Sequence, residues 1–197
     1  VITVSKRNEE IIKELGVSGS KVITVPNSFN NKEIFPMDKT NCRKKLGLPI
    51  EQTILLSVGN LEEVKGHKYL IDAVKILKKD YPNIRCYIIG GGSLVDFLQK
   101  RIEKFNLEDN VKLIGQLYHR EIGNWINSCD LFVLPSLAES FGIVQIEAFA
   151  CGKPVVATMN EGSKELISSE DYGYLCRVED PNDLAKMIDK ALRRNWD

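Results

Sequence analysis

The 197-residue sequence lacks several features that would place it in a specialised class of protein. It has no apolar run approaching the ~20 residues of a membrane span, and it has no internal repeat or low-complexity stretch. Basic and acidic residues number 27 each, so a nucleic-acid partner, which would need a concentrated basic surface, is not expected. The remaining composition, 43% hydrophobic and 27% charged, is that of a globular chain able to fold without metal or disulfide staples.

Cysteine and histidine are too few or too scattered for a metal site. The five cysteines contain no C-x-x-C pair, and Cys86, Cys129 and Cys151 lie in or beside apolar runs. A thiol in such a place behaves as a small hydrophobe, so the sequence predicts buried, reduced thiols and a cytoplasmic location. His67 and His119 are the only histidines, and each is predicted to lie at the surface or at a helix cap.

Apolar runs of strand length alternate with amphipathic helical stretches along most of the chain. Continuous runs such as residues 54–56 and 131–134 suit strands that are covered on both faces. The alternation predicts an α/β fold with a doubly wound parallel sheet of the Rossmann-like kind, whose ligands bind beyond the carboxyl ends of the strands. The predicted strands are residues 22–25, 53–58, 85–89, 111–114, 131–134, 154–157 and 174–178. The predicted helices are residues 67–79, 94–105, 121–127, 142–150, 164–167 and 181–193.

The first forty residues have a different pattern. Residues 1–5 and 22–25 are predicted as strands, residues 8–15 as a helix, and residues 26–31 as a turn-rich linker. A lone strand–helix–strand unit ahead of a complete domain indicates the tail of a preceding domain. We therefore expect residues 1–38 to be such a tail with its linker, and residues 39–197 to be the ligand-binding domain of a longer enzyme.

The most informative stretch follows the predicted strand 131–134 and enters a helix near Gly142. The free backbone N–H groups and the dipole at such a helix start suit a phosphate or a sugar oxygen. Glu139 lies just before the helix and Glu147 lies about five residues inside it, at ~1.5 Å rise per residue. Both carboxylates can then face one crevice and hold two hydroxyl clusters of one ligand. The alternative is that they merely complement the helix dipole.

Two further loops leave the carboxyl ends of predicted strands. After residue 58, Gly59 allows a tight exit, and Lys65 stands where it can neutralise a diphosphate or simply be solvated. After residue 89, the glycines at 90–92 let the backbone approach a ligand. Alone this triplet is weak, because Val95 holds the last position of G-x-G-x-x-G. Neither that dinucleotide fingerprint nor a P-loop is complete.

Together these segments resemble the C-terminal, donor-binding domain of the group 1 (family 4) glycosyltransferases, which have the GT-B architecture. The signature of that family is a Glu-x7-Glu segment within a P-S…E-x-F-G…E-A-x-A-x-G-x-P-V-V-A run, which residues 135–157 match. The resemblance extends over nearly the whole chain. The matching positions outside that run include Ser5, Asn27, Val58, Gly59, Lys65, Gly66, Gly90, Gly92, Gly115, Gly162 and Glu165.

The resemblance implies retaining, metal-independent transfer from a UDP- or GDP-sugar, with no cofactor and no bound metal. It implies catalytic roles for Glu139, which would hold donor-sugar hydroxyls, and for Lys65, which would pair with the diphosphate. Glu147 would hold the ribose hydroxyls, and Gln116 and Leu117 would border the base. The full set of implied donor-binding residues is Gly59, Asn60, Lys65, Gly90, Gly92, Gln116, Leu117, Glu139, Ser140, Phe141, Gly142, Ile143, Val144 and Glu147.

The sequence departs from the family pattern at three places. Asn60 stands where arginine is frequent, so diphosphate binding is expected to be weaker or to use another group. The linker has Ser28 after Asn27 where glycine is usual, and Glu161 replaces the first glycine of a late pair. Two alternatives stay open, namely a GT-B-related enzyme such as a sugar-nucleotide epimerase or phosphorylase, and a non-catalytic nucleotide-sugar-binding module.

The remaining partners follow from the resemblance as well. The acceptor, a glycan or a lipid-linked compound, is expected to meet the N-terminal domain, so the fragment alone is expected to bind nucleotide without transferring sugar. Peripheral association of the full-length enzyme with a membrane is left open.

Overall fold

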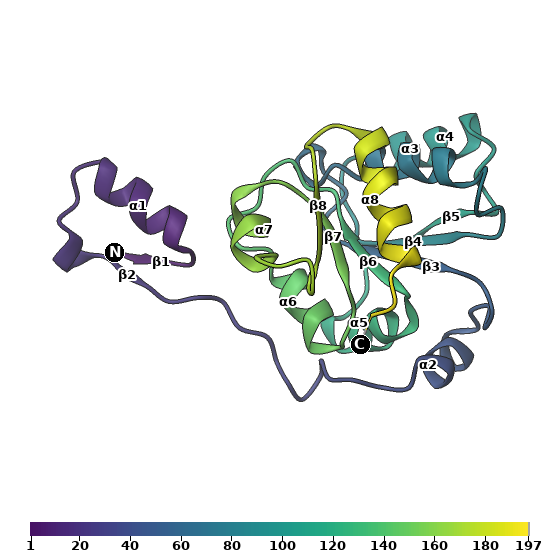
Figure 1. The fold of residues 1–197 in the computed structure, drawn as a ribbon, viewed down its shortest axis with the longest axis horizontal. Helices are drawn as coiled ribbons and strands as arrows, with labels where there is room; N and C mark the ends of the chain where they lie inside the picture. Colours follow the sequence, from purple (N-terminus) through teal and green to yellow (C-terminus); the bar gives the residue numbers. More distant parts are fainter. Residues whose placement is uncertain (197) are drawn as a thin grey trace.

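The protein is described here for residues 1–196 in a computed structural model. Its centre is a six-stranded sheet in the order β5-β4-β3-β6-β7-β8, and every neighbouring pair of strands is parallel. This arrangement confirms the predicted α/β, doubly wound fold (Figure 1). The strands are β3 (Ile54–Val58), β4 (Arg85–Ile89), β5 (Val111–Gly115), β6 (Leu131–Leu134), β7 (Val155–Thr158) and β8 (Gly173–Cys176).

Helices cover both faces of the sheet, which explains why its strands β3, β6 and β7 are buried along their length rather than at alternate residues. On β3, Leu55 joins the core beneath one helical layer and Leu56 joins the core beneath the other, because successive side chains point to opposite faces. The first layer holds α3 (His67–Leu77), α4 (Val95–Lys104) and α8 (Pro181–Arg193). The second holds α5 (His119–Ser128) and α6 (Ile143–Ala150), with α2 (Lys39–Leu46) packed on α5 and α7 (Glu161–Leu166) beside α6.

Residues 1–24 contain the strand–helix–strand succession that the sequence pattern predicts. β1 (Ile2–Thr3) pairs in parallel with β2 (Ile23–Thr24), and α1 (Lys6–Glu14) and a short turn η1 (Gly19–Lys21) connect them. No residue of α1 is buried, and Figure 1 shows this unit apart from the main sheet, at the end of an extended segment. Phe29 is partly buried against the core beneath α5, and Ile34 is fully buried within it.

The α-helix α2 is not predicted by the sequence pattern. Asp38 caps it by accepting a hydrogen bond from the Asn41 N–H, and Gly47 ends it in the left-handed conformation. Of its eight residues, however, only Cys42 and Leu46 are apolar, so it has no hydrophobic stripe at helical spacing. Its ends are encoded in the sequence, whereas its buried face is not.

The cysteines and histidines differ in how well they were predicted. All five cysteines are free and buried, as expected, and burial raises the pKa of the Cys86 and Cys129 thiols to about 12. His67, expected at the surface or a cap, is instead only 2% exposed. Burial, together with the nearby charge of Lys65, lowers the pKa of His67 to about 4, so its ring is neutral at pH 7.

Within residues 1–196, no helix is long and apolar enough to cross a membrane. No group of three or more histidine, cysteine, aspartate or glutamate side chains in that range is arranged to hold a metal ion.

Candidate functional site

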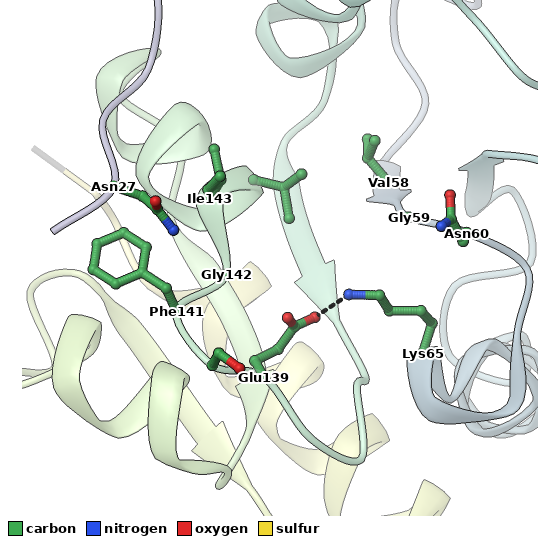
Figure 2. A pocket seen from close by; sticks show the side chains of 11 residues that line it. Asn27, Val58, Gly59, Asn60, Lys65, Glu139, Phe141, Gly142 and Ile143 are labelled. Atoms are coloured by element: carbon green, nitrogen blue, oxygen red, sulfur yellow. Dashed lines mark hydrogen bonds and ion pairs between the residues drawn. The ribbon is translucent and has the colours of Figure 1, made fainter. Parts of the chain in front are cut away.

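The strand order reverses between β3 and β6, which are neighbours at the centre of the sheet. At such a switch point the loops after the two strands diverge and leave a crevice at the carboxyl ends. A pocket of about 380 Å³ lies there (Figure 2). It is lined by Asn27, Val58, Gly59, Asn60, Lys65, Glu139, Ser140, Phe141, Gly142, Ile143 and Val144.

The loops after β3 and β6 are held together on both sides of Lys65, which ends the short turn η2 (Glu63–Lys65). On one side, the Leu137 N–H donates to the Val64 carbonyl at 2.8 Å. On the other, Gly66 has a φ of 64°, and a Cβ at this position would lie 2.1 Å from the Pro135 carbonyl oxygen. Glycine is therefore needed for this close approach, which fixes Lys65 opposite the loop that carries Glu139.

Lys65 and Glu139 point toward each other across the pocket (Figure 2), with Lys65 Nζ 2.6 Å from Glu139 Oε1. Ser136 Oγ donates to the same carboxylate oxygen at 2.8 Å. Among residues 1–196, Lys65 Nζ has no second hydrogen-bond partner, although an ammonium has three donors. The lysine can therefore turn to an anion in the pocket without losing any contact to backbone.

The start of α6 forms a second wall of the pocket that, like Lys65, favours a negatively charged ligand. Gly142 precedes the helix with a φ of 83°, and Ile143 and Val144 begin it. All three line the pocket. The N–H groups of a first helical turn have no partner within the helix, and the dipole is positive there, so this wall suits phosphate or sugar oxygens. The helix start predicted near Gly142 is confirmed.

Glu147 lies on α6 as predicted, but it does not line this pocket with Glu139. Its side chain is 3% exposed, and Glu147 Oε1 lies 2.7 Å from His119 Nε2. The other ring nitrogen, His119 Nδ1, lies 2.8 Å from Glu33 Oε2. Hydrogen bonds from the ring to Glu33 and to Glu147 raise the pKa of His119 above its ordinary value.

Two of the other predicted site residues, Gly90 and Gly92, support a loop that lines the pocket. Gly90 and Gly92 pack against the backbone of Gly59 and Leu61, where a Cβ would lie 2.0 Å and 2.5 Å from the respective carbonyl oxygens. The loop after β4 thus supports the loop after β3. The structure brings together Gly59, Asn60, Lys65, Glu139, Ser140, Phe141, Gly142, Ile143 and Val144. It places Gly90, Gly92, Gln116, Leu117 and Glu147 outside the lining of that pocket.

Four residues of the site were not predicted as such from the sequence. Asn27 lines the pocket from the linker, and Ser136 holds Glu139. Glu33 and His119 form the cluster with Glu147. Ser136 and His119 each stand within three residues of a predicted site residue, which is a usable signal. Glu33 carries no such signal.

Comparison with known proteins identifies a family model and several similar proteins that match this chain. A family model described as "Glycosyl transferases group 1" matches residues 38–195. An uncharacterized glycosyltransferase of Methanocaldococcus jannaschii is 32% identical over 98% of this chain and 50% of its own length. A D-inositol 3-phosphate glycosyltransferase of Paenarthrobacter aurescens is 32% identical over 92% of this chain and 45% of its own.

Solved structures of similar proteins superimpose on nearly the whole of this chain. Sucrose-phosphate synthase from Thermosynechococcus elongatus superimposes with a TM-score of 0.87 at 28% identity, over 98% of this chain and 48% of that one. Anabaena HepE, solved in complex with UDP, superimposes with a TM-score of 0.87 at 26% identity, over 98% of this chain and 53% of that one. The chain spans about half the length of the relatives that it matches.

Proposed function

The chain belongs to the group 1 glycosyltransferases, and from that premise we propose that its pocket binds the nucleotide-diphospho-sugar donor, a UDP- or GDP-sugar, of a sugar transfer. The observation that carries the proposal is the Lys65–Glu139 pair, which stands at the switch point of the sheet beside the start of α6. A cation and a helix start on opposite walls suit a diphosphate between them, and a carboxylate beside them suits sugar hydroxyls.

We assign the diphosphate to Lys65 and to the N–H groups at the start of α6. As the acceptor hydroxyl bonds to the sugar carbon, the bond from that carbon to the diphosphate oxygen breaks and negative charge develops on the departing diphosphate, which takes up the hydroxyl proton. Preorganised donors at the position of that charge lower the barrier. We propose that these groups replace a divalent metal and that transfer retains the anomeric configuration, as the resemblance implies.

We assign the donor sugar to Glu139 and the ribose to Glu147. In complex with the donor, Lys65 exchanges its bond with Glu139 for bonds to phosphate oxygens, which frees the Glu139 carboxylate to accept from sugar hydroxyls. Glu147 is already held by His119 through one oxygen, and a carboxylate retains further lone pairs for the ribose. The base then lies toward Gln116 and Leu117, at the end of β5.

The acceptor, a glycan or a lipid-linked compound, is proposed to bind outside this chain, in the other half of the protein. Complete transfer then needs both halves closed around the donor. The five buried free thiols support the cytoplasmic location expected from composition.

A binding panel on this chain tests the donor proposal. UDP, GDP, UMP, inorganic pyrophosphate and UDP-glucose are titrated by calorimetry and by thermal shift, since a ligand that binds the folded state raises its melting temperature. We expect one nucleoside diphosphate to bind more tightly than its monophosphate and than pyrophosphate. Equal affinity for UMP and the diphosphates would reject the diphosphate site, and binding of none of the five would reject the donor proposal.

A further inference from the structure

One face of α5 holds the chain segment that leads to the main body. His119, Gly123 and Asn127 recur at four-residue spacing, which places them on one side of a helix. Asn127 donates through Nδ2 to the Phe35 carbonyl at 3.0 Å and accepts through Oδ1 from the Met37 N–H at 2.8 Å. Residues 33–37 are therefore bound at the carboxyl end of this face.

The same segment is bound at the amino end of the face. A Cβ on Gly123 would lie 2.5 Å from the Glu33 carbonyl oxygen, so glycine is required for this approach. One helical turn earlier, His119 Nδ1 bonds to the Glu33 carboxylate at 2.8 Å. The segment 33–37 thus meets α5 through backbone and side chain at once, and Glu33 is fixed where its carboxylate faces the imidazole.

The second nitrogen of His119 connects this segment to α6. His119 Nε2 lies 2.7 Å from Glu147 Oε1, and the Glu147 side chain is 3% exposed. No other hydrogen bond to the Glu147 carboxylate occurs among the residues that the structure describes. The orientation of this buried carboxylate therefore depends on His119, and the orientation of His119 depends on Glu33.

We propose that His119 is a positioning residue that holds the Glu147 carboxylate for the ribose hydroxyls of the donor and couples that geometry to residues 33–37. The inference rests on the proposed function, which assigns the ribose to Glu147. Since residues 33–37 continue into the extended segment from the N-terminal unit (Figure 1), the nucleotide would be held less firmly whenever this segment leaves α5.

Protonation decides how many of the two bonds the imidazole can make. A protonated ring donates to both carboxylates, whereas a neutral ring has a single N–H and turns a lone pair toward the other carboxylate. The carboxylates facing the ring are Glu33 from the segment 33–37 and Glu147 from α6. On its own helix, Arg120 stacks on Tyr118 and Glu121 accepts from the Tyr118 N–H, so neither bonds to the ring. The number of hydrogen bonds that the ring donates to the two carboxylates therefore falls as pH rises through the pKa of His119, which lies above its ordinary value.

The test compares UDP with 2′,3′-dideoxy-UDP, which has the same diphosphate and base but no ribose hydroxyls. Calorimetric affinities are measured between pH 6 and 9 for the unchanged chain, His119→Ala, His119→Gln and Glu147→Gln, with Arg120→Gln as the control on the same turn. At pH 6 we expect His119→Ala to weaken UDP by about two- to tenfold, the usual worth of one hydrogen bond. Dideoxy-UDP should bind the variant and the unchanged chain alike, because it makes no contact with Glu147.

The pH profile separates positioning from simple packing. We expect the ratio of UDP to dideoxy-UDP affinity to fall with rising pH in the unchanged chain and to stay level in His119→Gln, which donates one neutral hydrogen bond at every pH. The titration of the diphosphate itself is common to both ligands and cancels in the ratio. A ratio that does not change with pH in the unchanged chain would contradict the role of the histidine.

The contact with residues 33–37 is tested by Gly123→Ala, whose methyl group displaces the Glu33 backbone without touching Glu147. It should weaken UDP but leave dideoxy-UDP unchanged, and an unchanged affinity for both would overturn the coupling. If Glu147→Gln weakens UDP while His119→Ala does not, the inference fails and the ribose assignment stands. If Glu147→Gln itself has no effect, or UDP does not bind, the ribose assignment fails and the inference falls with it.

Discussion

Two ion pairs stand at opposite ends of the same sheet and join its central strands to neighbouring segments. Arg43–Asp130, at 2.7 Å, lies at the amino ends of β3 and β6. Lys65–Glu139, at 2.6 Å, lies at their carboxyl ends. The two distances are alike, but the surroundings differ, and the difference separates a contact that holds the fold from one that a ligand can replace.

Around Arg43 the hydrogen-bonding capacity is heavily used. Its side chain is 2% exposed, and it donates to the Ser128 carbonyl at 2.8 Å, to the Gln52 carbonyl at 3.0 Å and to the Ile50 carbonyl. Asp130 accepts in turn from the Ile54 N–H at 2.7 Å. The planar guanidinium suits such a cluster of fixed acceptors. This pair therefore ties the start of β3 to the backbone around Ser128 and Gln52.

Around Lys65 much of the hydrogen-bonding capacity is unused. The lysine side chain is 26% exposed, bonds to one carboxylate oxygen, and is not tied to any carbonyl in the part of the chain that the structure describes. Both partners line the pocket. The carboxyl end of the sheet therefore carries charges with spare bonding capacity, and the amino end carries charges that are already satisfied.

The largest effect is expected from breaking the satisfied pair. Arg43→Ala should lower the free energy of unfolding by about 3–5 kcal/mol, because it leaves Asp130 without its buried partner and four carbonyls without this donor. Urea unfolding measures the loss. The folded fraction should bind nucleotide with unchanged affinity, since the pocket lies at the other end of the sheet. A loss of affinity equal to that of a pocket variant would remove the distinction between the two pairs.

At the carboxyl end of the sheet we expect a loss of nucleotide binding with little loss of stability. Lys65→Ala should weaken nucleoside-diphosphate binding by about ten- to hundredfold, the worth of a charge-assisted contact of about 1.5–3 kcal/mol. The free energy of unfolding should change by only about 1 kcal/mol or less, as for most partly exposed pairs. Lys79→Ala, an exposed lysine outside the pocket, serves as the control at low and moderate salt. Unchanged affinity in Lys65→Ala would refute the diphosphate role.

A somewhat smaller and more selective effect is expected from the two carboxylates. Each of Glu139→Gln and Glu147→Gln should cost about 1–3 kcal/mol of binding, the range for removing a charged hydrogen-bond partner. Glu147→Gln should weaken bare nucleotide and sugar donor alike, whereas Glu139→Gln should weaken the donor alone. Isothermal titration with UDP and UDP-glucose measures both. Carboxylates that only complement the helix dipole would instead shift stability by ~0.3–1 kcal/mol and leave binding unchanged.

The same contrast explains what the sequence could predict. Strands β3 and β6 are continuous apolar runs, and the pocket wall at residues 139–144 follows β6 directly along the chain, so short-range patterns suffice for both. The order of the strands brings Lys65 within reach of Glu139 although 74 positions separate them, and only the resemblance to a family indicated that proximity.

Contacts without a local pattern were missed. Glu33 and His119 are 86 positions apart, and Arg43 and Asp130 are 87 apart. Each of these charged residues looks like an ordinary solvated one until the tertiary packing is known. His67 was misassigned for the same reason, because only the packing of α3 against the sheet shows that it is buried. The separate roles of Glu139 and Glu147 remain predictions.

The smallest effect is expected at the exposed edge of the satisfied network. Lys39 Nζ lies 2.9 Å from Asp130 Oδ1, and its side chain is 48% exposed, so Lys39→Ala should cost only about 0.2–1 kcal/mol of stability at neutral pH. Burial alone would raise the pKa of Asp130, but the Ile54 N–H, the Lys39 hydrogen bond and the charge of Arg43 hold it below its ordinary value of 3.8. A lowered carboxylate pKa stabilises the fold above the unfolded value, and this stabilisation is lost as pH falls through the folded value.

The difference in stability between Lys39→Ala and the unchanged chain should therefore be complete above about pH 5 and vanish as Asp130 is protonated. Urea unfolding at several pH values between 7 and the acid transition measures it, and a difference that persists undiminished in acid would mean that Lys39 stabilises the fold through something other than Asp130.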